Sequence, residues 1–352
     1  MINKKLISIV LLFTFLGIVW WEIYVPKFST LSQPVMYTAK KGMGDEEIAR
    51  DLKKQEIIKS SAWFRFYTIV SRQDFKLQAG SYELSESMSV AQIVKKFVLG
   101  DVIKNNITIV EGWNARDIGK YFESKNIYSE KEFLAAVNKD WCQDQSTEIS
   151  EKFGARPSTQ LIECSGFEFL KDKPKNSSLE GYIFPDTYEI SGQELEDVLK
   201  NILANFDKKL TPDLRKEISL QRKSIFQIIT MASILEKEVI SQEDKKIVAG
   251  ILWKRIKEGI PLQVDATVNY VTGKHDQKVA IRDTKIDSPY NTYKYYGLPR
   301  GPISNPGMDS ILVAIYPQKS DYWYYLSADH TGKTIFSKTL EEHNKARVKY
   351  LK

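Results

Sequence analysis

The sequence predicts an α+β protein with an N-terminal transmembrane helix, a small α+β module and a larger mixed α+β domain. Three observations lead to this prediction. The chain begins with a long apolar run, the stretch after it repeats a short strand followed by an amphipathic helix, and the C-terminal half alternates strong helices with segments rich in Pro and Gly. Of its 352 residues 42% are hydrophobic and 27% charged, so the chain can bury two or three modest cores.

The apolar run covers residues 6–21 and follows Lys4 and Lys5. Positive charge before an apolar segment predicts a cytoplasmic N-terminus, and the aromatic residues that end the run suit the far membrane interface. We expect an uncleaved transmembrane anchor over residues 1–25, because no cleavage site of small residues follows it. A cleaved signal peptide and a buried core helix are the alternatives. Residues 26–34 then indicate a short extended linker.

A repeat follows the linker. Residues 35–64 and 107–134 share apolar and Gly positions at one constant offset, which pairs Gly42 with Gly112. Each copy predicts a strand, a turn and an amphipathic helix. Because the pattern resembles LysM modules, which hold N-acetylglucosamine polymers, we expect residues 35–104 to form a LysM-like α+β module. Glycan binding and a spacer that lifts the rest of the chain off the membrane are its two interpretations.

The larger domain is expected over residues 105–352. Its parts are the second LysM-like copy, an irregular polar insertion and the core: residues 105–137, 138–178 and 179–352. The insertion contains both cysteines of the chain, Cys142 and Cys164. In an oxidising compartment they could form a disulfide, and two free thiols are the alternative. The cysteines lack CxxC spacing and the three histidines are widely scattered, so we expect no metal site and no cofactor.

The helix predicted over residues 224–240 is apolar nearly all round and should be buried. Ile229, Ala232 and Glu236 share one stripe, so Glu236 interrupts an apolar face. Burial raises the pKa of a carboxyl group, as a general acid at neutral pH requires. The alternative is that Glu236 lies beyond the buried part and pairs with a surface lysine. Glu238, on a neighbouring stripe, is the rival carboxylate.

Two irregular segments, residues 288–293 and 297–307, are dense in Pro, Gly, Asn and Tyr. Such residues fix the backbone shape of a loop and offer stacking and hydrogen bonds to a sugar, although a rigid structural loop has the same composition. The segment 262–268 reads as a strand with two polar side chains on one side. The candidate substrate-binding residues are Gln263, Asp265, Tyr290, Asn291, Thr292 and Asn305.

Charge and motifs exclude several classes of function. The net charge is +6, but positive residues are spread along the chain, and no basic block interleaved with aromatics occurs. We therefore expect no nucleic-acid partner. A phosphate-binding loop, a dinucleotide fingerprint and a nucleophile elbow are absent from the sequence. The mild positive charge suits a protein that works near anionic lipid or wall polymer.

These motifs together resemble the YceG-like family of endolytic murein transglycosylases. The matching segments, in the family's order, are residues 179–188, 232–238, 262–268, 288–293, 297–307 and 328–344. The usual Asp-Pro-Thr is Asp265-Ala-Thr here, and the usual Asp-Gly-Thr-Gly is Asp329-His-Thr-Gly. The resemblance makes Glu236 the catalytic acid/base.

The resemblance also implies a reaction, partners and a location. It implies cleavage of the MurNAc–GlcNAc β-1,4 bond within nascent peptidoglycan strands, with release of a 1,6-anhydro-MurNAc end that stops strand elongation. It implies work beside penicillin-binding synthases, on the outer side of the cytoplasmic (inner) membrane.

One carboxylate suffices for such a reaction because the substrate supplies its own nucleophile. A hydrolytic glycosidase generally needs two carboxylates. The runner-up prediction is therefore a muramidase that uses water, with Glu236 as the acid and Asp265 or Glu238 as the base. A non-catalytic scaffold that binds peptidoglycan is the alternative from another class, and there Glu236 would be a structural residue.

Overall fold

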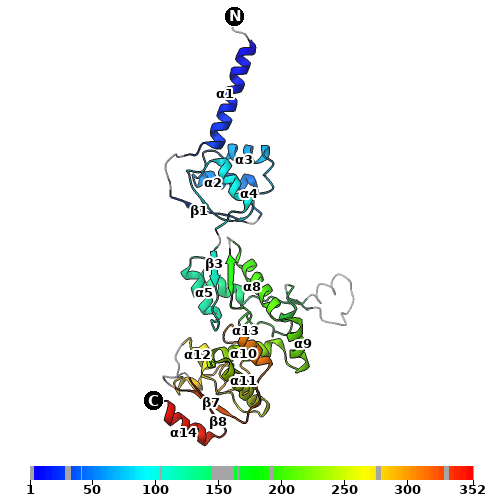
Figure 1. The fold of residues 1–352 in the computed structure, drawn as a ribbon, viewed down its shortest axis with the longest axis vertical. Coiled ribbons are helices and arrows are strands. Elements are labelled where there is room, and N and C mark those ends of the chain that lie inside the picture. Colours follow the sequence, from blue (N-terminus) through cyan, green and yellow to red (C-terminus); the bar gives the residue numbers. More distant parts are fainter. Residues whose placement is uncertain are drawn as a thin grey trace, which may run out of the picture. The chain divides into compact units, whose positions relative to one another are not determined.

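The computed structural model of the chain describes residues 4–27, 33–40, 42–103, 105–144, 162–164, 166–190, 193–274, 279–328 and 333–351. The chain forms two compact units (Figure 1): residues 1–107 with 188–194, and residues 108–187 with 195–352. Helices combine with pairs of short strands along the chain, so the predicted mixed α+β class is confirmed. The Asp329-His-Thr-Gly motif and part of the predicted linker lie outside the described residues.

The first unit begins with helix α1 (Lys4–Tyr24). Its segment Ile7–Tyr24 is long and apolar enough to cross a membrane, and nearly all of its side chains are exposed. The C-terminal end of α1 packs against α3 and α4, where the rings of Tyr24 and Tyr67 meet edge to face with centroids 6.2 Å apart. The predicted apolar N-terminal helix is therefore present.

The next part of the first unit is built on one antiparallel strand pair. Its elements are β1 (Val35–Ala39), α2 (Asp45–Lys54), α3 (Ser61–Val70), β2 (Gly80–Leu84) and α4 (Val90–Leu99). Tyr37 lies opposite Tyr82 in the pair β1–β2, and both rings pack on Phe97 of α4 with centroids 5.9 and 4.4 Å away. Helix α4 begins directly after Ser89, because Ser89 and Gln92 form a capping box.

The second copy of the repeat has the same order of elements. These are β3 (Asn105–Thr108), α5 (Ala115–Ser124), α6 (Glu130–Val137) and β6 (Thr187–Ile190), with β3 paired to β6. The long insertion enters between α6 and β6. Within it β4 (Gln143–Asp144) pairs with β5 (Ile162–Glu163), and a disulfide joins Cys142 to Cys164.

The rest of the second unit is mainly helical. Its elements are η1 (Glu168–Leu170), α8 (Leu195–Lys209), α9 (Pro212–Leu220), α10 (Ile225–Glu238), α11 (Gln242–Lys257), α12 (Asp265–Thr272), η2 (Asp283–Lys285), α13 (Met308–Ile315), β7 (Tyr324–Ser327), β8 (Thr334–Ser337) and α14 (Leu340–Tyr350). Helix α13 packs against α10 and α11 (Figure 1). This helical cluster holds the candidate site.

The predicted strand over residues 262–268 is wrong. Gln263 has a left-handed backbone with φ of 55°, which no strand tolerates, and Asp265 begins the helix α12. Gln263 and Asp265 therefore do not alternate along a strand. Helix α11 begins at Gln242, because the side chain of Ser241 accepts the N–H of Asp244 and caps it.

Candidate functional site

Helix α10 is fixed at its N-terminus and buried along its middle. Ser224 and Gln227 form a capping box, and the carboxylate of Asp172 accepts the N–H groups of Ile225 and Phe226. Every residue from 228 to 235 is buried. The last turn of the helix therefore has a fixed position at the edge of the hydrophobic core.

Glu236 lies in that last turn, with 9% of its side chain exposed. Its Oε1 accepts a hydrogen bond from Lys245 Nζ at 3.2 Å, and its Oε2 accepts the backbone N–H of Gly307 at 3.0 Å. Lys245 is itself 8% exposed and also donates to Ser310 Oγ at 2.9 Å. Both contacts fit an ionised carboxylate and offset the cost of taking its charge out of water.

The Pro- and Gly-rich segment runs along α10 toward Glu236. Ser233, one turn before Glu236, accepts the N–H of Ile303 at its Oγ and the hydroxyl of Ser304 at its carbonyl, both at 3.0 Å. Gly307 then reaches Glu236 itself. These partners are buried or nearly so, and buried polar groups keep their hydrogen bonds. The position of the segment along α10 is therefore fixed. The position of the Gly307 N–H, which donates to the Glu236 carboxylate, is fixed with it.

Asn305 joins three segments at this place. Its backbone pairs with the turn before α5, because Gly112 N–H donates to its carbonyl at 2.9 Å and its own N–H donates to the carbonyl of Trp113 at 2.8 Å. Its side-chain oxygen accepts the N–H groups of Gly181 and Ile183 at 2.8 and 3.0 Å. Asn305 is fully buried, so its polar atoms serve contacts within the protein.

Glu180 is a buried carboxylate behind Asn305. It accepts hydrogen bonds from the N–H of Ala115, from the amide of Asn305 at 2.9 Å and from the hydroxyl of Tyr270. Burial raises the pKa of Glu180 to about 7. The ring of Tyr270 in turn packs against Tyr290, with centroids 5.0 Å apart. Asn305 is thus connected through Glu180 and Tyr270 to Tyr290, one of the predicted substrate-binding residues.

The segments around Gln263 and Thr292 lie together. Gln263 N–H donates to the carbonyl of Thr292 at 3.1 Å, and the Thr292 hydroxyl accepts the N–H of Val264 and pairs with the hydroxyl of Thr267. Thr292 is buried, whereas the Gln263 side chain is exposed. Of this pair, the side chain of Gln263 is the one that faces solvent.

Asn291 and Tyr290 also differ in their exposure to solvent. The Asn291 amide donates to the carbonyls of Thr284 and Ile286 at 2.9 and 2.8 Å, and its oxygen accepts the N–H of Tyr293. Asn291 is buried, so it shapes the loop from inside. Tyr290 is partly exposed, and burial raises the pKa of its hydroxyl.

The remaining two carboxylates singled out by the sequence form a separate group. Glu238 accepts the hydroxyl of Tyr325 at 3.0 Å, and Asp265 accepts the hydroxyl of Tyr293. Burial, together with the charge of Asp265, raises the pKa of Glu238 to about 7. Glu238 and Asp265 therefore act on each other, while the contacts of Glu236 are to Lys245 and Gly307.

Sequence reasoning missed two charged residues of the site. Lys245 is one, and Glu111, in the turn before α5, is the other. Burial raises the pKa of Glu111, and the charge of Glu236 raises it further, whereas Lys245 lowers it. All three groups are therefore close enough to interact electrostatically.

The repeat contained a signal for Glu111. The turn glycines Gly42 and Gly112 correspond in the two copies, but the residue before Gly42 is Lys41, whereas Glu111 precedes Gly112. The residue before the turn glycine is therefore basic in the first copy and acidic in the second, and the turn of the second copy lies near Glu236. Lys245 had no comparable signal, because it stands among other charged residues at the start of α11.

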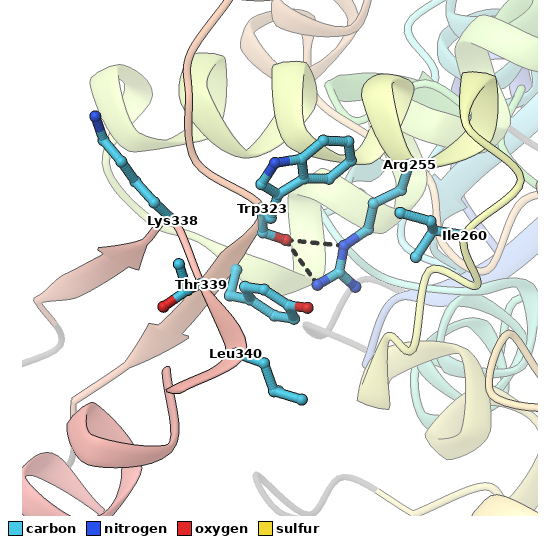
Figure 2. Close-up of a pocket in the computed structure, with 7 residues that line it drawn as sticks. Arg255, Ile260, Trp323, Lys338, Thr339 and Leu340 are labelled. Atoms are coloured by element: carbon cyan, nitrogen blue, oxygen red, sulfur yellow. Dashed lines mark hydrogen bonds between the residues drawn. The ribbon is translucent and has the colours of Figure 1, made fainter. Parts of the chain in front are cut away.

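A cavity of about 250 Å³ lies between α11, the β7–β8 hairpin and the start of α14 (Figure 2). Arg255 spans it and donates from Nε and Nη2 to the carbonyl of Trp323 at 2.9 and 2.7 Å. The seven lining residues include none of the predicted site residues. Within the described part of the chain, no group of three or more His, Cys, Asp or Glu could hold a metal ion.

Comparisons with known proteins show which proteins the whole chain is similar to. The chain is 35% identical over 313 residues to an endolytic murein transglycosylase of Bacillus subtilis, and the match covers 88% of this chain and 83% of that protein. It is 32% identical over 321 residues to an endolytic murein transglycosylase of Streptococcus pneumoniae, where the match covers 86% of this chain and 56% of the relative.

A solved structure and a family model extend the comparison. A yceG-like protein of Listeria monocytogenes, known from a crystal structure, is 32% identical with a TM-score of 0.56, and the match covers 90% of this chain and 99% of that one. The model of the YceG-like family matches residues 37–349, nearly the whole chain. The chain belongs to the YceG-like family.

Proposed function

We propose that this chain is an endolytic lytic transglycosylase of peptidoglycan. It cleaves the β-1,4 bond between MurNAc and GlcNAc in nascent glycan strands and leaves a 1,6-anhydro-MurNAc end, which stops elongation of the strand. The observation that carries the proposal is the sheltered carboxylate of Glu236, held by Lys245 and the Gly307 N–H at a buried helix end. Relatives named for this activity support the same assignment.

Glu236 acts twice in the proposed reaction. It first gives a proton to the glycosidic oxygen as the bond from that oxygen to C1 of MurNAc breaks. It then takes the proton of the C6 hydroxyl of the same sugar as O6 bonds to C1, so no water is added. Between the two steps Glu236 is an anion, and the donors Lys245 and Gly307 N–H stabilise it without reorganisation.

The predicted substrate-binding residues divide into two kinds in this proposal. Gln263, Asp265 and Tyr290 are at least partly exposed, and they contact the sugar and its N-acetyl groups. Asn291, Thr292 and Asn305 are buried, and their hydrogen bonds within the protein support the loops that surround the site. Substitution of the first kind should raise KM, whereas substitution of the second should reduce stability.

The remaining parts of the chain have roles in the same proposal. Helix α1 anchors the protein in the cytoplasmic (inner) membrane and keeps the larger unit in the cell-wall space. The order β1–α2–α3–β2, with its strands antiparallel, is what a LysM-like module needs, and this module would bind glycan. Penicillin-binding synthases that extend the strand are the expected protein partners.

Mass spectrometry of the products tests this function. Purified glycan strands are incubated with the protein, and an anhydro end is lighter than a hydrolysed end by one water. Glu236→Gln should fold normally and give no product, while the matched control Glu123→Gln, an exposed glutamate of α5, should be fully active. Hydrated ends would indicate a water-using muramidase, and binding without cleavage a scaffold. Activity in the Glu236→Gln variant would refute the role of Glu236.

A further inference from the structure

We propose that the outer face of helix α3 lies in the interface of the membrane that α1 crosses, so that the first unit rests on the lipid bilayer through this helix. The inference goes beyond the proposed reaction, and it rests on the proposed anchorage by α1. The outer face is the side of α3 that the protein leaves at least partly exposed. It consists of Ala62, Trp63, Phe66, Ile69 and Val70.

Helical geometry places these apolar residues on one side of α3, because positions three, four and seven apart share a face. The opposite side faces the core through Phe64 and Thr68, which are completely buried. The one charged residue of α3, Arg65, pairs with Asp45 and Glu46 of α2. A surface helix normally carries polar residues on the side away from the core. The outer face of α3 is apolar instead, which marks it as an interaction surface.

The outer face lies next to the end of α1. Tyr67, which borders this face, meets the ring of Tyr24 with centroids 6.2 Å apart. Lys59, just before α3, places its Nζ 5.6 Å from the centre of the Trp21 ring and donates to the carbonyl of Val25 at 3.3 Å. Figure 1 shows α3 beside the end of the unit from which α1 leaves. The position of α3 is therefore fixed at the point where α1 ends.

The length of α1 sets where the membrane surface lies. The apolar segment Ile7–Tyr24 has 18 residues, which at ~1.5 Å per residue span about 27 Å, close to the ~30 Å hydrocarbon core of a bilayer. Trp20, Trp21 and Tyr24 end this segment, and such rings favour the membrane interface. Because α3 contacts this end of α1 without a spacer, its outer face lies at the level of the lipid headgroups.

The loop after α3 has a composition that suits the same environment. Phe75 is 96% exposed, and the exposed cations Arg72 and Lys76 flank it. The loop contains one acidic residue, Asp74, which is partly buried. Apolar rings that accompany cations bind the boundary between headgroups and acyl chains, and the cations attract anionic lipid. The loop therefore extends the lipid-binding character of the outer face.

Lipid is the partner that this position favours. A second copy of the chain or another protein would have to reach the outer face at the level where α1 leaves the bilayer. A glycan strand needs polar partners for its hydroxyl groups. Among the five side chains of the outer face, only Trp63 has a polar atom, its indole N–H.

Nitroxide accessibility in the full chain tests the inference. Spin labels are attached to Ile69→Cys on the outer face and to the matched control Glu83→Cys, an exposed position of β2 in the same unit. The two native cysteines are joined in a disulfide and do not take the label. The protein is placed in vesicles of phosphatidylcholine and phosphatidylglycerol. Oxygen concentrates in lipid and a nickel chelate stays in water, so the oxygen-to-nickel collision ratio should be several-fold higher at position 69 than at position 83.

A second variant tests whether the apolar side chains cause the contact. Phe66→Gln combined with Val70→Gln makes the outer face polar while the label stays at position 69. Both side chains are exposed, so thermal unfolding should change little. The collision ratio at position 69 should fall toward the value at position 83. An unchanged ratio would contradict the inference, because the contact would then not depend on the apolar face.

A label at Leu12→Cys, in the middle of α1, separates this inference from the proposed anchorage. A lipid-exposed label at position 12, with position 69 as open to the nickel chelate as position 83, would overturn the inference alone. A water-exposed label at position 12 would overturn the anchorage. Formation of anhydro ends is measured separately and tests the proposed reaction.

The other possible partners of the outer face give different results in the same experiment. Protection of position 69 from both oxygen and the nickel chelate would show that a second copy of the chain covers the face. A ratio that changes only after purified glycan strands are added would show a glycan-binding surface. Either result would overturn the inference.

Discussion

The hydroxyl of Ser304 donates to the carbonyl of Ser233 at 3.0 Å, deep in the interface between α10 and the Pro- and Gly-rich segment. Both residues are completely buried. Their contact lies one helical turn before Glu236, so it sets where the segment meets the proposed acid/base. The site is therefore held by a pair of serines that take no part in the chemistry.

Substitution of Ser233 by Ala should loosen this interface. The change leaves the buried N–H of Ile303 without its acceptor, which destabilises the fold by about 1–3 kcal/mol. Thr230→Val is the matched control on the same helix, because among the described residues the Thr230 hydroxyl bonds within the helix, to the carbonyl of Phe226. Urea unfolding of both variants measures the difference, and equal losses would contradict a special role of Ser233.

Substitution of Lys245 by Met should abolish most activity. The methionine keeps the apolar stem but removes the cation that bonds Glu236 and Ser310, so the anion formed during the reaction loses its stabilising donor. We expect kcat to fall by on the order of a hundredfold. Lys246→Met, on the same helix, is the control and should retain normal kinetics. A fully active Lys245→Met variant would show that the buried pair is only structural.

The sequence predicted the elements whose signals are local. The helix that carries Glu236 was predicted from its buried apolar stretch, and in the structure Ser224 caps it. The repeat was predicted from one constant offset, and the strands and helices of both copies follow it, with Val35 and Asn105 beginning the corresponding strands. Periodicity and capping are properties of neighbouring residues, which one sequence displays.

Contacts between segments that are distant in the sequence could not be predicted from such local patterns. The meeting of Glu111 with Gly307 and of Lys245 with Glu236 depends on the packing of three helices and two loops. The strand predicted at Gln263 failed for a related reason. Its alternating pattern was right for a strand, but a left-handed residue held by Thr292 overrides that pattern.

Replacement of both Cys142 and Cys164 by Ser should lower stability but leave activity unchanged. The disulfide closes a loop with a sequence separation of 22, and loss of that constraint on the unfolded chain destabilises by about 3 kcal/mol. The bond lies in the insertion, outside the residues that contact Glu236. Thermal unfolding with and without a reductant, beside an activity assay, checks both parts. A large loss of activity in the folded variant would place the insertion in the site.

Glu180 should make the stability of the protein depend on pH. Burial raises its pKa from 4.5 to about 7, so the folded protein holds a proton that the unfolded chain has released between these values. The stability that this group contributes is thus fully present below about pH 4.5 and is lost as the pH rises to about 7. The loss over this window is on the order of 3 kcal/mol.

Glu180→Gln isolates this effect, because the variant cannot ionise at position 180 while Glu238, whose pKa is also raised to about 7, remains in both proteins. At about pH 5 the variant should be the less stable protein, since the two oxygens of Glu180 accept the Asn305 amide and the Tyr270 hydroxyl separately, whereas Gln has only one side-chain oxygen. As the pH rises to about 8, the unaltered protein should lose stability relative to the variant. Urea unfolding at the two pH values measures the change, and parallel pH profiles would show that Glu180 does not hold a proton in the fold.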